Sequence, residues 1–194
     1  MTVQLILASA SPRRQELLAQ IGVRYRVEAV DIDETPKSNE LPVDYVVRIA
    51  AEKSAMCIYN DMHITLPVLS ADTSVVIDGN ILGKPENEAH ADSMLRQLSA
   101  KTHKVYTAIS LRSTDGQHHQ ILSETEVKFR SISTKEIQAY WQTGEPQGKA
   151  GGYAIQGLAS IFVESINGSF SGVVGLPLFE TAQLLSKQGI NVIT

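Results

Sequence analysis

Two hydroxyl side chains and two arginines stand together near the N-terminus. Residues 9–14 read SASPRR and follow the short apolar run of residues 4–8. A junction between a strand and a helix exposes backbone N–H groups and the positive end of the helix dipole, so Ser9, Arg13 and Arg14 are candidates for binding phosphate. A capped surface helix with solvated arginines is the alternative.

A second candidate pair is Asp72 and Thr73, which follow the apolar residues 68–71. We expect this carboxylate at the carboxyl end of a core strand, where open α/β sheets place ligand-binding groups. It could hold a divalent metal or accept a proton from an attacking water, and a turn aspartate is the alternative. Lys84 follows twelve residues after Asp72, between a glycine and a proline. A short hairpin would carry its ammonium back toward Asp72, whereas the alternative is a solvated loop lysine.

Acidic side chains cluster ahead of a Thr-Pro pair at Asp31, Asp33 and Glu34. Like charges this close repel unless a cation or solvent screens them, so Glu34 is a candidate ligand for Mg²⁺. A solvated acidic loop is the alternative. Lys53, which follows in a predicted helix, is by itself more typical of an exposed helical lysine.

A glycine-rich stretch, residues 144–157, carries Lys149 and Gln156. Backbone rich in glycine can approach a base or a sugar closely. The Gln156 amide has both a donor and an acceptor, so it could bind the imide edge of uracil or thymine. A plain structural turn is the alternative.

The periodicity of apolar residues predicts the elements that must position these side chains. Ser11 followed by Pro12 indicates one helix start, and a capping box at Ser133 and Glu136 indicates another. Because strands and helices interleave with hairpins, we predict an α/β fold with a mixed twisted sheet flanked by helices. The expected strands span residues 4–8, 25–30, 67–77, 81–83, 105–111, 121–129 and 160–166, and the expected helices span residues 12–21, 42–59, 88–98, 134–141 and 178–185.

Composition narrows the classes of function. The chain has 194 residues, 43% of them hydrophobic, and a net charge of −4. This charge disfavours general nucleic-acid binding, which needs a surplus of basic side chains. One cysteine, Cys57, excludes an internal disulfide. No apolar run approaches the ~18 residues of a membrane helix, and the N-terminus lacks a basic leader, so we expect a cytoplasmic protein that binds no membrane. The phosphate-loop motif and the G-x-S-x-G motif of serine hydrolases are both absent from the sequence.

Taken together, these segments resemble the Maf family of nucleotide pyrophosphatases. The resemblance extends over nearly the whole chain, and its segments occur in the same order as in the family. It is specific because these segments occur together. It is carried by residues 7–14 (LASASPRR), 48–53 (RIAAEK), 71–76 (ADTSVV), 83–85 (GKP), 149–157 (KAGGYAIQG) and 174–177 (VGLP). The sequence departs from the family where Ser70, Ala100, Gly148 and Gly172 replace an expected Gly, Gly, Asp and Asn.

The resemblance implies a single domain over residues 1–194, elongated and two-lobed with a central cleft, similar to inosine triphosphate pyrophosphatases. It implies a hydrolase that cuts a nucleotide between its α and β phosphates with a divalent cation, Mg²⁺ or Mn²⁺. Residues Arg13, Thr73 and Gln156 match the dTTP/UTP pyrophosphatase subgroup. Two alternatives are a house-cleaning enzyme for modified nucleotides and a regulatory binding protein in cell division. A homodimer is a further expectation.

Roles for individual side chains follow from the resemblance. Asp72 would accept the proton of the attacking water, with Lys84 as the second catalytic group. Glu34 and Asp72 would hold the metal. The substrate would be bound by Ser9, Arg13, Arg14, Lys53, Thr73, Lys149 and Gln156.

Overall fold

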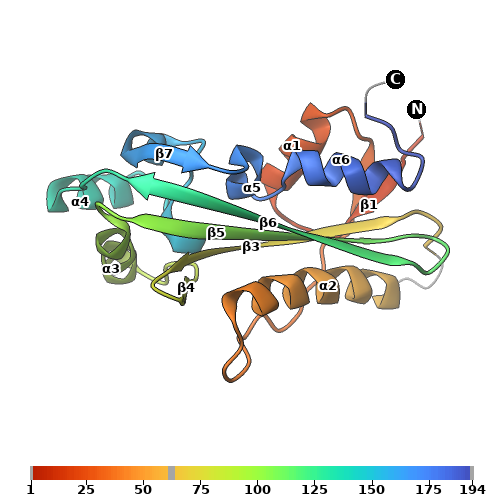
Figure 1. The fold of residues 1–194 in the computed structure, drawn as a ribbon, viewed down its shortest axis with the longest axis horizontal. Coiled ribbons are helices and arrows are strands. Elements are labelled where there is room, and N and C mark those ends of the chain that lie inside the picture. The colour runs from red at the N-terminus through yellow and green to blue at the C-terminus, as the bar shows by residue number, and fades with distance from the viewer. Residues whose placement is uncertain (1, 61–63, 193–194) are drawn as a thin grey trace.

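One sheet of seven strands extends along the molecule in the computed structural model, which describes residues 2–60 and 64–192. Among the described residues the strand order is β2-β1-β3-β5-β6-β7, and β4 pairs with β3 beside this path (Figure 1). β1 is parallel to β2 and β3, and the other pairs are antiparallel, so the predicted mixed sheet is confirmed. The strands are β1 (Leu5–Leu7), β2 (Tyr25–Val27), β3 (Val68–Ile77), β4 (Asn80–Leu82), β5 (Thr102–Arg112), β6 (His118–Phe129) and β7 (Val163–Asn167).

The long strands β3, β5 and β6 form the centre of the sheet. β5 pairs with β6 along its whole length and with β3 from Lys104 onward. Both β5 and β6 begin three residues earlier than predicted, because backbone pairing continues through polar residues that interrupt the apolar pattern. β2 ends at Val27 rather than at residue 30, because its partner β1 ends at Leu7 in the paired register.

Helices cover both faces of the sheet. α2 lies along one face, where Val46, Ile49 and Ala50 pack against Val76 and Tyr106. α1, α5 and α6 lie over the opposite face at one end, and α3 and α4 lie at the other end (Figure 1). The flanking helices that the sequence predicts are therefore present. They are α1 (Pro12–Gln20), α2 (Pro42–Asn60), α3 (Glu88–Leu98), α4 (Thr134–Gln142), α5 (Phe170–Val174) and α6 (Leu178–Ser186).

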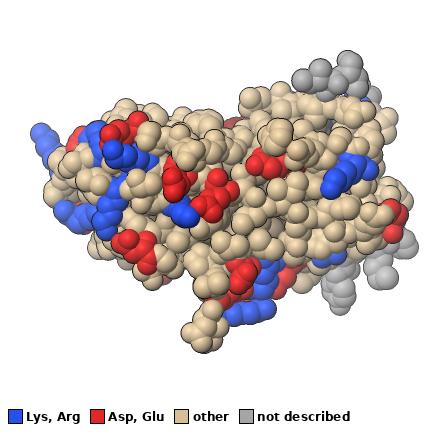
Figure 2. All heavy atoms as spheres, viewed as in Figure 1, with Lys and Arg blue, Asp and Glu red and all other residues tan. Residues whose placement is uncertain are grey.

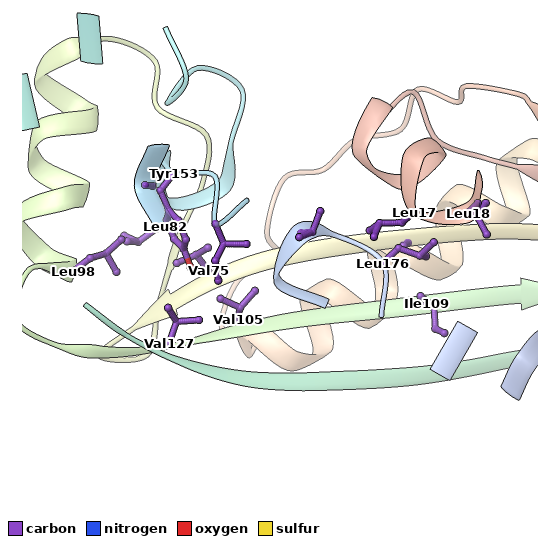
Figure 3. Close-up of a cluster of buried hydrophobic side chains, with 14 of the residues drawn as sticks. Leu17, Leu18, Val75, Leu82, Leu98, Val105, Ile109, Val127, Tyr153 and Leu176 are labelled. Atoms are coloured by element: carbon purple, nitrogen blue, oxygen red, sulfur yellow. The ribbon is translucent and has the colours of Figure 1, made fainter. Parts of the chain in front are cut away.

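The main core lies on the face opposite α2. Figure 3 shows its side chains in two groups along the sheet. Leu98 and Tyr153 belong to the group near α3, and Leu17, Leu18 and Leu176 belong to the group near α1. The group near α1 packs that helix against the sheet. The group near α3 packs the glycine-rich segment, through Tyr153, against the same sheet.

The segment after residue 148 departs most from the prediction. The expected strand 160–166 is confirmed only from Val163 onward, as β7, because residues 160–162 belong to a 3₁₀ helix, Leu158–Phe162. Another 3₁₀ helix, Ala150–Gly152, and the short helix α5 were not predicted. Each of these elements is at most five residues long, too short for a hydrophobic period to appear in the sequence.

Two of the departures from the family have visible consequences. Ala100 stands where a glycine was expected and adopts a left-handed φ of 59°, which costs a residue with a Cβ about 1–2 kcal/mol. Ser70 is buried, and its hydroxyl donates a hydrogen bond to the Ala50 carbonyl of α2 (2.6 Å). Ser70 therefore attaches α2 to the sheet.

Candidate active site

A cleft with a volume of about 810 Å³ opens at a gap in one edge of the sheet. On this edge β1 pairs with β3 at Val68 and Leu69, and β4 pairs with it from Val75 to Ile77. Within the described residues no strand pairs with the part of β3 between them on that edge. The candidate residues from distant parts of the sequence all line this cleft: Ser9, Arg13, Arg14, Glu34, Lys53, Asp72, Thr73, Lys84, Lys149 and Gln156.

Asp72 and Thr73 lie in the middle of β3, so the prediction that they end a strand is wrong. β3 continues to Ile77 because its other edge pairs with β5 without interruption. The strand that ends at the cleft is β1, and the rule that ligands bind at carboxyl ends of strands applies to it. Successive side chains of a strand point to opposite faces. Asp72 therefore faces α2 and Lys53, while Thr73 faces α1 and Arg14.

The Arg14 guanidinium connects three segments that border the cleft. Its Nε donates to the Gly175 carbonyl (2.8 Å), its Nη1 to Ser9 Oγ (3.1 Å) and its Nη2 to Thr73 Oγ1 (3.4 Å). Burial lowers the pKa of Arg14, while the nearby charge of Asp72 opposes this shift. A guanidinium stays protonated in proteins, so a full positive charge is held in a fixed orientation at the cleft.

Ser9, rather than Ser11, supplies the side-chain contact at the start of α1. Ser11 occupies the N-cap position and Pro12 the first helical position, as predicted, but the Ser11 side chain caps no N–H group. Ser9 Oγ instead accepts a hydrogen bond from the Ser11 N–H (3.2 Å). This arrangement leaves the first turn of α1 at the cleft without a side-chain cap, where backbone N–H groups favour an anion.

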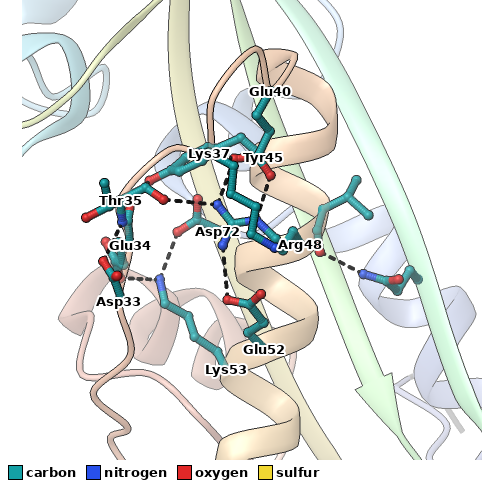
Figure 4. A network of polar contacts seen from close by, with 12 residues as sticks. Asp33, Glu34, Thr35, Lys37, Glu40, Tyr45, Arg48, Glu52, Lys53 and Asp72 are labelled. Atoms are coloured by element: carbon teal, nitrogen blue, oxygen red, sulfur yellow. Dashed lines mark hydrogen bonds and ion pairs between the residues drawn. The ribbon is translucent and has the colours of Figure 1, made fainter.

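Lys53 lies between two carboxylates. Its Nζ is 2.8 Å from Asp72 Oδ1 and 2.7 Å from Glu34 Oε1 (Figure 4). Lys53 is 9% exposed and Asp72 is 8% exposed, so the expectation of an exposed helical lysine is wrong. α2 turns Lys53 inward on the same side as Ile49 and Ala50, which pack on the sheet.

Burial and charge act in opposite directions on the two carboxylates. Burial raises the pKa of Asp72, and the ammonium of Lys53 and the guanidinium of Arg14 only partly oppose it. Partial burial also acts to raise the pKa of Glu34, but the hydrogen bond and charge of Lys53, with the charges of Lys84 and Arg14, hold it below its usual range. Of the two carboxylates, Asp72 therefore has the higher affinity for a proton.

The loop that carries Glu34 is held by residues that the sequence analysis did not single out. Arg48 of α2 makes a bidentate ion pair with Glu40, with Nε–Oε1 and Nη2–Oε2 distances of 2.6 and 2.7 Å. Its Nη2 also donates to the Thr35 carbonyl (3.2 Å), and the Tyr45 hydroxyl donates to the Glu34 carbonyl (2.9 Å) (Figure 4). The hydrogen bond from Arg48 lowers the pKa of Glu40 to about 2. Arg48 belongs to the family-like segment 48–53, a signal that could have identified it.

Removal of the Arg48 side chain is expected to release this loop. Arg48→Met loses the fork geometry that binds Glu40 and the Thr35 carbonyl together, so the loop should open more often. Trypsin cleavage after Lys37, which lies in the loop, should become about tenfold faster at equal protein concentration. Arg96→Met removes an exposed i,i+4 pair with Asp92 and is the matched control. Equal cleavage rates in Arg48→Met and wild type would show that the pair does not hold the loop.

The glycine-rich segment contributes Lys149 and Gln156 to the lining of the cleft. The Gly151 N–H donates to the Gly83 carbonyl (3.0 Å), so the segment is joined to the residue before Lys84. Gly151 has a φ of 67°, and a Cβ there would lie 2.9 Å from Val75 Cγ1. Glycine is therefore required for this close approach to β3. Lys84 and Gln156 are exposed at the edge of the cleft.

Glu145 holds the glycine-rich segment through hydrogen bonds. It was not predicted as a functional residue. Its Oε1 accepts hydrogen bonds from the Tyr140 hydroxyl (2.7 Å) and the Ala159 N–H (3.2 Å), and its Oε2 accepts from the Leu158 N–H (2.9 Å). The Tyr140 hydroxyl in turn accepts from the Ala154 N–H (3.2 Å). These contacts hold the backbone on both sides of Gln156, at Ala154 and at residues 158–159.

If the chain hydrolyses the nucleotide that the resemblance implies, we expect Glu145→Gln to weaken substrate binding more than turnover. The amide has the size of the carboxylate but one acceptor fewer, so a backbone N–H of Leu158 or Ala159 loses its partner. KM for that nucleotide should rise about five- to tenfold while kcat changes less than about twofold, in steady-state assays. Glu164→Gln, at an exposed pair with Lys128, should change neither constant. A fall in kcat at constant KM would contradict this role.

Two carboxylate oxygens that converge on one cation suit a hard divalent metal. Mg²⁺ prefers oxygen ligands and is often held by one or two carboxylates with substrate phosphates. Glu34 Oε1 and Asp72 Oδ1 provide such a pair. Among the described residues no group of three or more His, Cys, Asp and Glu side chains could hold a metal ion, so an ion at this pair would take its other ligands from water or substrate.

The surface carries charges of both signs. On the face in Figure 2, most Lys and Arg side chains lie beside Asp or Glu side chains. Ion pairs such as Lys101–Asp78, Lys104–Glu124 and Lys128–Glu164 join exposed residues.

No helix in the described part of the chain is long and apolar enough to cross a membrane.

Comparison with known proteins extends over nearly the whole chain. The family model described as Maf-like protein matches residues 4–188. A dTTP/UTP pyrophosphatase of Nitrosomonas europaea is 53% identical and covers 96% of this chain and 95% of its own length. A dTTP/UTP pyrophosphatase of Colwellia psychrerythraea is 52% identical and covers 96% and 89%, respectively. A solved dITP/XTP pyrophosphatase of Mycobacterium abscessus aligns with a TM-score of 0.42 at 15% identity, over 66% of this chain and 75% of that chain.

Proposed function

Because the chain belongs to the Maf-like protein family, we propose that it is a nucleoside triphosphate pyrophosphatase that hydrolyses dTTP and UTP to the monophosphate and pyrophosphate. Relatives at about half identity over nearly their full length carry that activity in their names. The observation that carries the proposal is a cleft in which basic side chains from four segments surround one buried aspartate. We also propose that the chain acts in the cytoplasm as one two-lobed domain, and a homodimer stays a prediction.

The basic side chains of the cleft suit a triphosphate. Arg13, Arg14, Lys53, Lys84 and Lys149 all line it. A triphosphate bound among them would gain charge-assisted hydrogen bonds from guanidinium and ammonium groups. Ser9 and the first turn of α1 would add neutral donors. Gln156, at the rim, would bind the imide edge of the base.

Asp72 is the proposed proton acceptor. It would orient a water for in-line attack on the α phosphorus and take one of its protons. The bond from the α phosphorus to the bridging oxygen would break, and pyrophosphate would leave with that oxygen. Lys84 and Arg14 would stabilise the charge that develops on the phosphate oxygens.

The Glu34–Asp72 pair is the site that we propose for a divalent cation. We propose Mg²⁺ or Mn²⁺, with these two side chains as its protein ligands. When bound, the ion would neutralise charge on the triphosphate.

Product identification tests the proposed function. The purified protein, supplied with Mg²⁺ and a panel of ordinary and modified nucleoside triphosphates, is expected to release pyrophosphate and the monophosphate from UTP and dTTP. Release of orthophosphate and a diphosphate would show that a different bond is cut. A large preference for modified pyrimidine nucleotides would instead favour a house-cleaning role.

A further inference from the structure

The Lys53 ammonium occupies the position between the two proposed metal ligands. Its Nζ lies 2.7 Å from Glu34 Oε1 and 2.8 Å from Asp72 Oδ1, and the residue is 9% exposed. Both distances are typical of charge-assisted hydrogen bonds. Two of the three N–H groups of the ammonium are therefore directed at carboxylates.

The other cleft lysines of the described chain are arranged differently. Lys84 is exposed at the rim, and Lys149 Nζ donates to the Gln147 carbonyl (3.1 Å). Within the described part of the chain, neither Lys84 nor Lys149 forms an ion pair with a carboxylate, whereas Lys53 forms two. A lysine that served solely to bind phosphate would not need this inward position.

We propose that Lys53 acts as an internal counter-ion that keeps the Glu34–Asp72 pair closed to a free divalent cation until a nucleotide binds. The proposal rests on the proposed function and adds an order of binding to it. The triphosphate offers the ammonium new acceptors, so Lys53 can leave the carboxylates as the metal–nucleotide complex enters.

Geometry and charge both support this exchange. Mg²⁺ binds oxygen at about 2.0–2.1 Å, so an ion that bridged these two oxygens would overlap the ammonium now held between them. A free cation would have to displace Lys53 without giving it another partner, and breaking a buried charge pair in that way is costly. Since coupling between ligands is reciprocal, a nucleotide that attracts Lys53 should strengthen metal binding, and the metal should strengthen nucleotide binding.

Titration of the nucleotide-free protein with Mn²⁺, followed by electron paramagnetic resonance of the free ion, tests the proposal at mildly alkaline pH. Lys53→Met removes the ammonium and keeps an apolar stem of similar length. It is expected to bind Mn²⁺ at least about tenfold more tightly than wild type. Mn²⁺ alone should also raise the Tm of Lys53→Met and leave that of wild type nearly unchanged.

Lys84→Met is the matched control, because the charge of Lys84 also acts on Glu34 from within the cleft. It removes one positive charge without opening the carboxylate pair, so Mn²⁺ affinity should change less than about threefold. Equal Mn²⁺ affinity in Lys53→Met and wild type, or an equal gain in Lys84→Met, would overturn the proposal. Lys53→Gln replaces Lys53→Met if circular dichroism shows that the latter is unfolded. Pyrophosphate release by wild type is measured separately, so a failed Mn²⁺ prediction leaves the proposed function standing, and the reverse also holds.

Discussion

Replacement of Asp72 by Asn is expected to lower kcat/KM for UTP by about 10³-fold, the effect of losing a positioned general base. The amide keeps the shape of the side chain and can still accept a hydrogen bond from Lys53, but it cannot take a proton from water. Pyrophosphate release, measured over a range of UTP concentrations, gives kcat and KM separately. We expect most of the loss in kcat.

Stability separates this chemical effect from a folding defect. Burial raises the pKa of Asp72, so the folded state holds its proton more tightly than the unfolded state does. The ionised carboxylate therefore reduces stability at pH values above its raised pKa, and this cost disappears as the pH falls through it. Asp72→Asn carries no such charge, so its Tm at neutral pH should not fall by more than a few degrees.

A matched control lies at the end of the same strand. Asp78 is exposed in the turn after β3 and pairs with Lys101. Asp78→Asn should leave kcat/KM within about twofold of wild type, because exposed ion pairs contribute little. If Asp72→Asn retained more than about a tenth of the activity, Asp72 would not be the base.

The pH profile gives an independent check on the same residue. Because the proposed proton acceptor is the ionised form of Asp72, activity should be lost as the pH falls through its pKa. Burial raises that pKa, so the acid limb of kcat/KM should lie above the range of an exposed aspartate. An acid limb within the ordinary carboxylate range would contradict the buried environment described for Asp72.

Local patterns in the sequence were sufficient for the framework of the fold. α3 has the predicted bounds, and the capping box at Ser133 and Glu136 begins α4. These features depend on neighbours within a few residues, which a single sequence contains. Pairing between distant strands is a different matter. The gap between β1 and β4 on the edge of β3 depends on where three separate strands end, and no local pattern encodes it.

In the candidate site, too, the sequence identifies residues, whereas the contacts between them depend on the fold. Nine of the ten candidate side chains in the cleft lie in family-like segments, and Glu34 was identified from the acidic cluster at residues 31–34. Lys53 has the appearance of an ordinary helical lysine until α2 is placed on the sheet opposite Asp72. Arg48 and Glu145 act through hydrogen bonds to backbone and carboxylate groups in loops, and the conformations of those loops were not predictable from periodicity.

The second large effect is expected from Arg14→Lys, which should lower kcat/KM for UTP by about 10²-fold. Arg14 donates hydrogen bonds to Gly175, Ser9 and Thr73, in directions that its planar guanidinium can satisfy together. A lysine has one nitrogen and cannot reach all three acceptors at once. The charge would remain near the cleft, but its position would no longer be fixed relative to Ser9, Thr73 and the end of α5.

Arg13→Lys is the comparison that isolates this geometry. Arg13 is the preceding residue of the same helix and lines the same cleft, but it is only partly buried, and its pKa is lowered chiefly by that burial. A lysine there keeps the charge, so kcat/KM should fall less than about tenfold. Equal losses in the two variants would mean that charge alone matters at the start of α1. A selective loss in Arg14→Lys would mean that activity depends on the contacts of Arg14. These contacts join Ser9 after β1, Thr73 of β3 and the end of α5 around the gap in the sheet.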